Sequence, residues 1–313
     1  MPLLQLNAYG SDFTLHAGHE PPRPTLERAL DGSGPVIIMV HGFKFSPGHP
    51  VACPHRHILS LAPERRCRKA ASWPRGLGFG TPDPSEGLAI AFGWQARGAI
   101  WTAYRQAELA GDALAQLITI IHAIAPERPI HAIAHSLGAR VVLSALPVLQ
   151  PGLLRRAILL AGAEYESRAS AAMASAGGQR TEVINITSRE NDLFDVMLEM
   201  LIAPSRRGDR ALGLHMPDRP NTVTLQLDHA DTLNALSRIG FPVAPPTSTI
   251  CHWSSYLRAG VFALYAAALR GDSRLDMVEL RRLAAQPPQP RWARVRPLPS
   301  VGLPALSGRP VAR

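Results

Sequence analysis

A serine stands at a turn between an apolar stretch and a helical pattern. Residues 130–139 read I-H-A-I-A-H-S-L-G-A, with Ala134 two positions before Ser136 and Gly138 two positions after it. A serine on such a sharp strand-to-helix turn adopts a strained backbone conformation, and small residues on both sides avoid collisions across the turn. Its hydroxyl projects at the positive end of a helix, where developing negative charge is stabilised. The pattern therefore predicts a nucleophilic Ser136, in preference to a serine that only caps a helix.

A second turn offers backbone donors for an oxyanion. Residues 36–43 read V-I-I-M-V-H-G-F, an apolar strand that ends in H-G-F. Two N–H groups must point at one substrate oxygen, and one of them belongs to Leu137, the residue after the serine. We expect the other to come from Phe43, because Gly42 allows the backbone to bend there. His41 is expected to support the turn and to take no part in proton transfer.

An acid is expected after the serine, at the end of a later strand. The strand predicted over residues 183–187 is followed by the loop S-R-E-N-D, in which Asp192 stands where the chain turns into a helix. Asp is also a common N-cap residue, but the position suits the orienting acid of a triad, and we favour that role. Glu190 and Asp195 are nearby alternatives. Glu164, which follows the preceding strand, is another.

Two histidines are candidates for the general base. His229 directly follows the last predicted strand, in L-Q-L-D-H, and His252 precedes the last long helix, in C-H-W-S-S-Y. A base must lie on a loop that reaches both the serine and the acid. Three prolines in residues 241–249 stiffen the loop before His252, and stiffening lowers the entropy lost in holding the side chain. The sequence around His229 is typical of a polar helix start, so we favour His252 as the base.

Short β-branched stretches alternate with longer helical patterns along the chain. Such alternation is typical of a mostly parallel central sheet with helices on both faces. The spacing of apolar residues predicts strands over residues 36–40, 88–94, 130–134, 157–161, 183–187 and 222–227. It predicts helices over residues 101–125, 137–146, 193–202, 230–239 and 254–270. The predicted fold class is therefore α/β.

The net charge of +9 is concentrated near the carboxyl end. Seven arginines and no acid follow Glu279, and the rest of the chain has a net charge of only +2. Proline is frequent in the same stretch. We therefore predict one folded domain over residues 1–280 and a flexible Pro/Arg-rich tail over residues 281–313. A basic tail is not a basic face on a folded domain, so nucleic-acid binding is not expected.

The sequence shows no signal for export or membrane insertion. No uninterrupted apolar stretch reaches the ~18 residues that a membrane span requires, and residues 1–20 lack a basic start followed by a long apolar segment. We therefore expect a cytoplasmic protein without integral membrane association. Its cysteines, Cys53, Cys67 and Cys251, do not form a disulfide framework, and their spacing to nearby histidines matches no common zinc site.

Together these motifs resemble the α/β-hydrolase superfamily, in particular a poorly characterised bacterial group with an A-H-S-x-G elbow and an H-G-F oxyanion turn. The S-W-P segment at residues 72–74 and a histidine at the start of the last helix add to the resemblance, which extends over about residues 36–270. It implies that Ser136 is the nucleophile, Asp192 the orienting acid and His252 the base. The chain departs from the pattern in lacking the first elbow glycine. A long interval also separates the last strand from the favoured base, which keeps the earlier histidine open.

The resemblance implies an α/β-hydrolase fold that hydrolyses a carboxylic ester or thioester through an acyl-enzyme. The expected partner is a small-molecule ester or acyl substrate, and this chemistry requires no metal or organic cofactor. Two alternatives remain open: a non-catalytic relative that uses the fold for binding, and an acyltransferase that excludes water. Binding of the arginine-rich tail to an anionic membrane or nucleic acid is a separate alternative.

Overall fold

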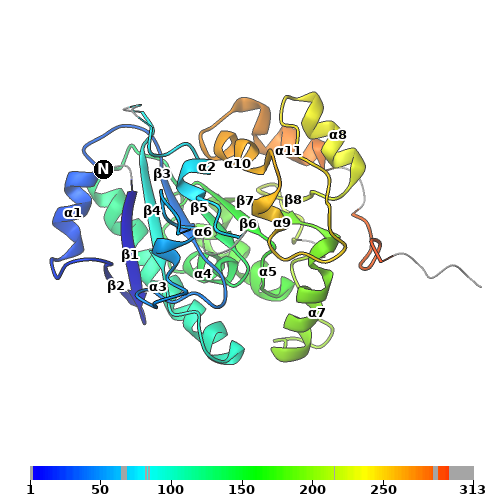
Figure 1. Cartoon of the computed structure of the whole chain (residues 1–313), viewed down its shortest axis with the longest axis horizontal. Helices are drawn as coiled ribbons and strands as arrows, with labels where there is room; N and C mark the ends of the chain where they lie inside the picture. The colour runs from blue at the N-terminus through cyan, green and yellow to red at the C-terminus, as the bar shows by residue number, and fades with distance from the viewer. Residues whose placement is uncertain are drawn as a thin grey trace, which may run out of the picture.

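The computed structural model of the chain describes residues 3–64, 69–81, 83, 85–214, 216–284 and 288–295. Its strands are β1 (Leu3–Tyr9), β2 (Asp12–Leu15), β3 (Val36–Val40), β4 (Leu88–Gly93), β5 (Ile130–His135), β6 (Arg156–Leu160), β7 (Glu182–Thr187) and β8 (Thr222–Gln226). They form one sheet in the order β2-β1-β4-β3-β5-β6-β7-β8 (Figure 1). β1 and β2 are antiparallel, and the other neighbouring pairs are parallel. The predicted α/β class with a mostly parallel sheet is confirmed.

Helices cover both faces of this sheet (Figure 1). One apolar core lies between the sheet and α1 (Pro22–Ala29), α3 (Ile100–Ile124), α4 (Gly138–Ala145) and α5 (Glu166–Ala174), with α6 (Ala176–Arg180) beside α5. The other lies under α2 (Trp73–Gly76), α8 (Ala230–Arg238), α9 (Ser254–Leu257), α10 (Val261–Leu269) and α11 (Met277–Leu283). α7 (Asp192–Leu201) follows β7.

The central strand β3 shows why the sheet is buried on both sides. Val36, Ile38 and Val40 belong to the core on the α3 side, and Ile37 and Met39 belong to the core on the α10 side. All five side chains are fully buried. An apolar strand without alternation is expected where helices cover both faces. The carboxyl ends of the parallel strands are then the natural place for a ligand.

Helix α3 is long and apolar enough to cross a membrane by length and composition alone. In the folded chain, however, Ala107, Leu114, Leu117 and Ile121 are buried in the core shared with α4. Half of the most apolar part of the helix is buried. Since these residues recur at spacings of three and four, the burial is that of a core helix packed by one face.

An amino-terminal hairpin, absent from the strands predicted by apolar spacing, precedes β3. β1 and β2 pair antiparallel, and Leu3–Asn7 of β1 pair in parallel with β4. β2 is only four residues long, and its side chains are exposed or half-buried. β2 is the edge strand, and β1 beside it is only partly buried, so the hairpin lacks a clear apolar alternation that periodicity could detect.

The helix predicted over residues 254–270 is divided into α9 and α10. Gly260 separates them, with a φ angle of 88° in the left-handed region. A Cβ at this position would lie 2.0 Å from the carbonyl oxygen of Pro242. Glycine therefore allows the proline-rich loop to touch the chain at the break, and the α-helix cannot continue through it.

Part of the tail predicted from residue 281 contacts the folded body in the structure. Helix α11 extends past the predicted boundary, and Arg291 forms two hydrogen bonds of 2.9 Å with the Glu199 carboxylate. The Trp292 N–H donates to Oδ2 of Asp192 at 2.6 Å. Polar groups of residues 288–295 thus have partners on the folded body. The other parts of the predicted tail, 285–287 and 296–313, lie outside the described residues.

Candidate active site

Ser136 lies at the sharp turn between β5 and α4. Its φ angle is 55°, in the left-handed region that residues with a Cβ rarely adopt. Its N–H donates to the Leu160 carbonyl at 3.0 Å, and its carbonyl accepts from the N–H groups of Ala139 and Ala163. Hydrogen bonds from both sides therefore maintain the strained turn, as is common at functional sites.

The H-G-F turn after β3 contacts the serine turn directly. A Cβ at position 42 would lie 2.7 Å from the Ser136 Cβ and 2.8 Å from the His135 carbonyl oxygen, so only Gly42 permits this approach. The turn brings Phe43 to the same cavity as Leu137. Within the described part of the chain, the backbone N–H groups of Phe43 and Leu137 have no protein acceptor. Two free donors beside a serine are what an oxyanion hole requires.

The His41 side chain supports this turn from inside the protein. Its Nδ1 lies 2.9 Å from the Gly42 carbonyl oxygen, and the Trp94 N–H donates to its Nε2 at 3.0 Å. These contacts place the proton on Nδ1 and use both ring nitrogens. Burial lowers the pKa of His41 to about 4. The ring is therefore a neutral structural support, in agreement with the sequence-based expectation.

One cavity of about 290 Å³ brings together four of the predicted residues. Ser136, Leu137 and Phe43 line it from the turns after β5 and β3, and His252 lines it from the loop before α9. The remaining wall is mostly apolar and includes residues of α7, α9 and the start of α3. The cavity lies at the carboxyl ends of the parallel strands, where ligands bind in open α/β sheets.

Two more residues of this cavity wall have left-handed backbone. Lys44 has a φ angle of 76° and Ala161 one of 46°. The Lys44 N–H donates to the Ala96 carbonyl at 2.7 Å, and the Ala161 N–H donates to the Ile186 carbonyl at 3.0 Å. The turns after β3 and β6 are therefore held in unfavourable conformations by hydrogen bonds to other segments.

An amide holds the His252 ring. Its Nδ1 lies 2.6 Å from Oδ1 of Asn191, and one face stacks on Phe194. The Nδ2 group of Asn191 donates to Oδ1 of Asp195 at 2.8 Å, which turns the amide oxygen toward the imidazole. Nδ1 of His252 must then carry the ring proton. This tautomer leaves Nε2 unprotonated, as a general base requires.

His135, the residue before the serine, anchors the loop that carries His252. Its Nε2 donates to the His252 carbonyl at 3.0 Å, and the two ring centroids lie 4.5 Å apart. Burial lowers the pKa of His135 to about 4. Burial, with smaller effects of His135 and Lys69, holds the pKa of His252 well below its usual range. Both rings are therefore neutral at neutral pH.

Asp195 supports Asn191 from inside the protein. Its Oδ1 accepts the amide hydrogen bond, while Oδ2 is buried without a hydrogen-bond partner among the described residues. Burial raises the pKa of Asp195 to about 7. The charged groups that face it are Arg189, Arg291, Asp192 and Glu199, of which the arginines oppose the rise and the acids add to it. The carboxyl group therefore changes charge near neutral pH.

Asp192, the predicted orienting acid, does not contact His252. One of its carboxylate oxygens accepts from the Trp292 N–H at 2.6 Å, and the other lies 3.3 Å from Nη1 of Arg189. The prediction is corrected by one residue, because Asn191 occupies the place beside the imidazole. Consecutive residues entering a helix point about 100° apart. Only one side chain of the N-D pair can therefore face the histidine.

The alternative acids are also engaged elsewhere. Glu164 forms a buried ion pair with Arg140 and accepts a 2.5 Å hydrogen bond from the Tyr104 hydroxyl. Glu190 accepts from Ser188 at 3.1 Å and lies 3.8 Å from Nη2 of Arg258. Neither glutamate lines the cavity that contains Ser136.

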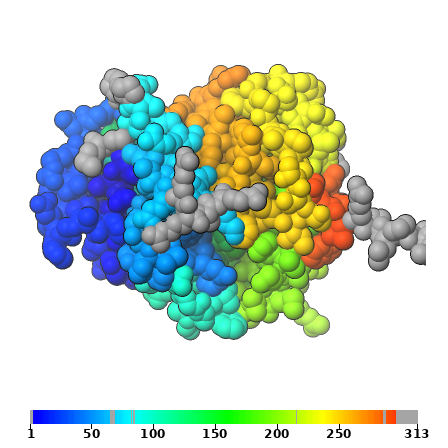
Figure 2. All heavy atoms as spheres, in the orientation of Figure 1, coloured from blue at the N-terminus to red at the C-terminus, as the bar shows by residue number. Residues whose placement is uncertain are grey.

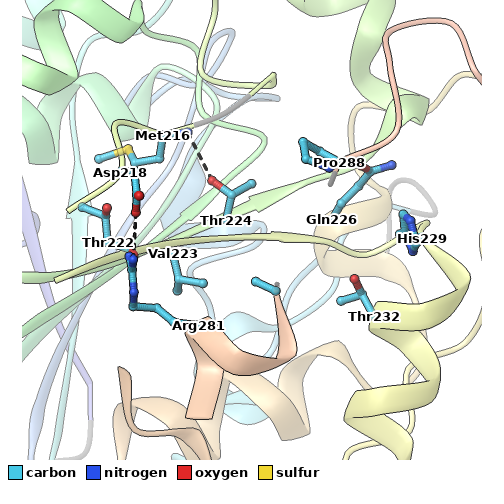
Figure 3. Close-up of a pocket in the computed structure, with 11 residues that line it drawn as sticks. Met216, Asp218, Thr222, Val223, Thr224, Gln226, His229, Thr232, Arg281 and Pro288 are labelled. Carbon is cyan, nitrogen blue, oxygen red and sulfur yellow. Dashed lines mark hydrogen bonds and ion pairs between the residues drawn. The ribbon is translucent and has the colours of Figure 1, made fainter. Parts of the chain in front are cut away.

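The other candidate histidine, His229, lies at a different cavity. It is the N-cap residue of α8, and its Nδ1 accepts from the Asp231 N–H at 3.2 Å. Figure 3 shows it beside Thr232 on the wall of a cavity of about 470 Å³ at the edge strand β8. Ser136 and His252 do not line that cavity. The structure therefore places His252, and not His229, in the cavity of the serine.

Sequence reasoning missed the role of Asn191. A search for a charged partner of the histidine passes over an amide, although Asn191 lies in the same loop as the predicted acid. A usable signal is the four-residue spacing from Asn191 to Asp195, which brings an amide and a carboxylate together at the start of a helix.

The comparison with protein families matches residues 25–152 to a family described as an alpha/beta hydrolase of unknown function (DUF900). The match includes the H-G-F turn, the serine turn and α3, but covers less than half of the chain and ends before Asn191 and His252. The comparison with curated proteins found no match. With the strand order of the sheet, the family match shows that the chain has an α/β-hydrolase fold.

Solved structures similar to this chain include three hydrolases. The catalytic core of an acetyl xylan esterase from Trichoderma reesei has 13% identity and a TM-score of 0.27, over 42% of this chain and 64% of that one. A Trichoderma reesei cutinase in complex with a phosphonate inhibitor has 12% identity and a TM-score of 0.27, over 82% of this chain and 80% of the cutinase chain. An acylaminoacyl peptidase from Pyrococcus horikoshii has 14% identity and a TM-score of 0.26, over 50% of this chain and 28% of the peptidase chain. The chain thus spans less than two thirds of the length of the esterase and of the peptidase. With TM-scores this low, the α/β-hydrolase fold is shown by the family match and the strand order alone.

Proposed function

We propose that this α/β hydrolase cleaves a carboxylic ester or thioester through an acyl-enzyme, with Ser136 as nucleophile and His252 as base. One observation carries the proposal: a single cavity is lined by the serine, the histidine and two residues, Phe43 and Leu137, whose backbone N–H groups have no acceptor among the described residues. The serine is on a strained strand-to-helix turn, and the histidine is neutral with its Nε2 unprotonated. These are the parts that acyl transfer requires.

The reaction proposed for this site has two halves. Oγ of Ser136 attacks the substrate carbonyl carbon while its proton passes to Nε2 of His252. The oxyanion is stabilised by the N–H groups of Phe43 and Leu137 and by the positive end of α4. The bond to the leaving alcohol or thiol breaks as the imidazolium returns the proton to it. Water then attacks the acyl-enzyme with His252 again as base, which releases the carboxylic acid and restores Ser136.

Asn191 takes the orienting role for which a carboxylate was predicted. Its Oδ1 accepts the Nδ1–H of His252 and so fixes the tautomer and direction of the ring. A catalytic histidine oriented by asparagine is an established variant of this arrangement. An amide has no net charge, so it stabilises the imidazolium less than a carboxylate does.

The test is covalent labelling with a fluorophosphonate, which reports an activated serine without knowledge of the substrate. Wild-type protein is expected to be labelled, and Ser136→Ala is expected to be unlabelled while it remains folded. Ser144→Ala, a change of the same size on α4, is the control and is expected to be labelled normally. His252→Ala should prevent labelling, whereas His229→Ala should not. Labelling of Ser136→Ala, or folded wild-type protein that does not react, would contradict the proposal.

A further inference from the structure

Helix α7 turns acidic residues toward the protein interior and apolar residues toward solvent, the reverse of an ordinary surface helix. Asp192 and Asp195 are buried, and Glu199 is half-buried in its ion pair with Arg291. These acids face the arginines of the protein interior. A helix at a protein surface normally turns its charged residues toward water. The reversal means that the opposite face of α7 is apolar and exposed.

Four large apolar residues of α7 are exposed. Met200 has an exposed fraction of 79%, Met197 one of 44%, Leu201 one of 40% and Leu193 one of 38%. They lie at positions i, i+4, i+7 and i+8, which place them along one side of a helix. Single exposed apolar residues are common, but a contiguous group indicates a binding surface.

The exposed side of α7 continues into the cavity of Ser136. Met197 and Leu201 both line the cavity and are exposed to solvent, so an apolar path leads from the serine to the surface. The first turn of α3 forms the other side of this path. Ile100 lines the cavity, and Nε1 of the exposed Trp101 donates to the Leu201 carbonyl at 2.6 Å. In Figure 2 the teal atoms of α3 and the yellow-green atoms of α7 lie together at the lower edge.

We propose that the surface between α7 and the first turn of α3, hereafter the α7 groove, binds the alkyl chain of the substrate. The substrate is then an aliphatic ester or thioester with a medium or long acyl chain. The inference rests on the proposed function, because Ser136 fixes where the substrate carbonyl carbon lies. Its independent support is the position of the exposed apolar residues, which begin inside the cavity and extend outward along α7.

The chain length of the substrate should therefore control the reaction rate. Each methylene group moved from water to an apolar wall contributes a factor of about four to binding. The rate constant for reaction with Ser136 should rise by about this factor for each added methylene group, until the α7 groove is filled. A short chain such as acetyl leaves Met197 and Leu201 in water and gains nothing from them.

The experiment measures second-order rate constants for inactivation by p-nitrophenyl methyl-, butyl- and octylphosphonates. In each case Oγ of Ser136 bonds to phosphorus, p-nitrophenolate leaves, and the serine proton passes to His252. The only difference among the reagents is the length of the alkyl chain. We expect the octyl reagent to react at least 100 times faster than the methyl reagent. Equal rates would overturn the inference and leave the proposed function intact, whereas no reaction with any reagent would overturn both.

Met197→Gln tests the groove itself, because glutamine has nearly the shape of methionine but is polar. The octyl-to-methyl rate ratio is expected to fall at least fivefold in this variant. Val148→Gln, an equally polar change at an exposed valine outside the cavity, should leave the ratio unchanged. An unchanged ratio in Met197→Gln would contradict the assignment. A wild-type dimer in light scattering that dissociates in Met200→Gln would also overturn it, since the face would then join two copies of the chain.

Discussion

Nδ1 of His252 lies 2.6 Å from Oδ1 of Asn191, and the neighbouring Asp192 carboxylate bonds to other groups. The orienting contact of the proposed base is therefore neutral. The nearest negative charge in this chain of contacts belongs to Asp195, which reaches the histidine only through the amide. Mutations of these three residues should consequently have different effects.

Replacing the amide should reduce catalysis more than replacing Asp192. Asn191→Ala removes the acceptor that orients His252 and is expected to lower kcat/KM by about 100-fold, the cost of misplacing a catalytic group by about 1 Å. Asn191→Asp keeps an acceptor and should retain most of the activity. Asp192→Asn should lower kcat/KM by less than about tenfold. Ester hydrolysis by the three variants decides the matter: inactive Asp192→Asn with active Asn191→Ala would assign the orienting role to Asp192.

The raised pKa of Asp195 should make stability depend on pH. Because burial moves this pKa from 3.8 to about 7, the folded state binds a proton that the unfolded state releases between these values. The stability associated with the proton is complete below pH about 4 and is lost as the pH rises to about 7. Asp195→Asn removes this loss, so its Tm relative to wild type should rise between pH 5 and pH 8.

The change in Tm should be several degrees, since 1 kcal/mol corresponds to about 2–4 °C in a domain of 150–250 residues. Asp231→Asn is the matched control, because this carboxylate is exposed, and its Tm difference from wild type should not vary with pH in the same way. A constant Tm difference between Asp195→Asn and wild type from pH 5 to pH 8 would show that the carboxyl group has an ordinary pKa.

The contact between the two turns predicts a large effect of one methyl group. Gly42→Ala places a Cβ 2.7 Å from that of Ser136, so the turns must separate and the Phe43 N–H must move. A loss of at least about 100-fold in kcat is expected, as for removal of an oxyanion-hole donor. Gly32→Ala, where a Cβ meets no atom within 4 Å, is the control. Normal turnover by folded Gly42→Ala would exclude this turn as the source of the second donor.

Glu164 should be a stabilising residue and not a catalytic one. Glu164→Gln removes the buried partner of Arg140 and leaves it only the more exposed Glu108 carboxylate. Breaking a buried ion pair costs about 3–5 kcal/mol when the remaining charge is left unpaired, so a loss below that range is expected. Unfolding in urea should show this loss, while kcat of the remaining folded protein should stay near that of wild type. The opposite result, normal stability with no turnover, would place the orienting acid after β6.

The sequence predicts most of the fold because its strands and helices are long or uniformly apolar. β3, β5 and α3 are each recognisable from spacing alone, and the small residues around Ser136 predict the left-handed turn that the structure contains. The hairpin of β1 and the edge strand β2 is not predicted, since its place in the sheet depends on pairing between β1 and β4, about 85 residues further along the chain.

The residue that orients His252 is harder to predict from the sequence than Ser136 and His252 themselves. The type and spacing of residues identify the loop after β7, but the direction of each side chain depends on how the turn enters α7. Asp192 is turned away by Arg189 and by Trp292, which lies 100 residues further along the chain. A contact of that separation leaves no local pattern from which to predict it.

Lys44, Ser136 and Ala161 have left-handed backbone, and all three line one cavity. Such conformations cost about 1 kcal/mol or more for residues with a Cβ, and glycine avoids most of that cost. Substitutions that make the protein more resistant to heat should therefore be found in the cavity wall beside Ser136, for example Ala161→Gly. Directed evolution for thermal resistance alone would select such changes and would relax the turns on which turnover depends. For this protein, a screen for stability should always be paired with a screen for activity.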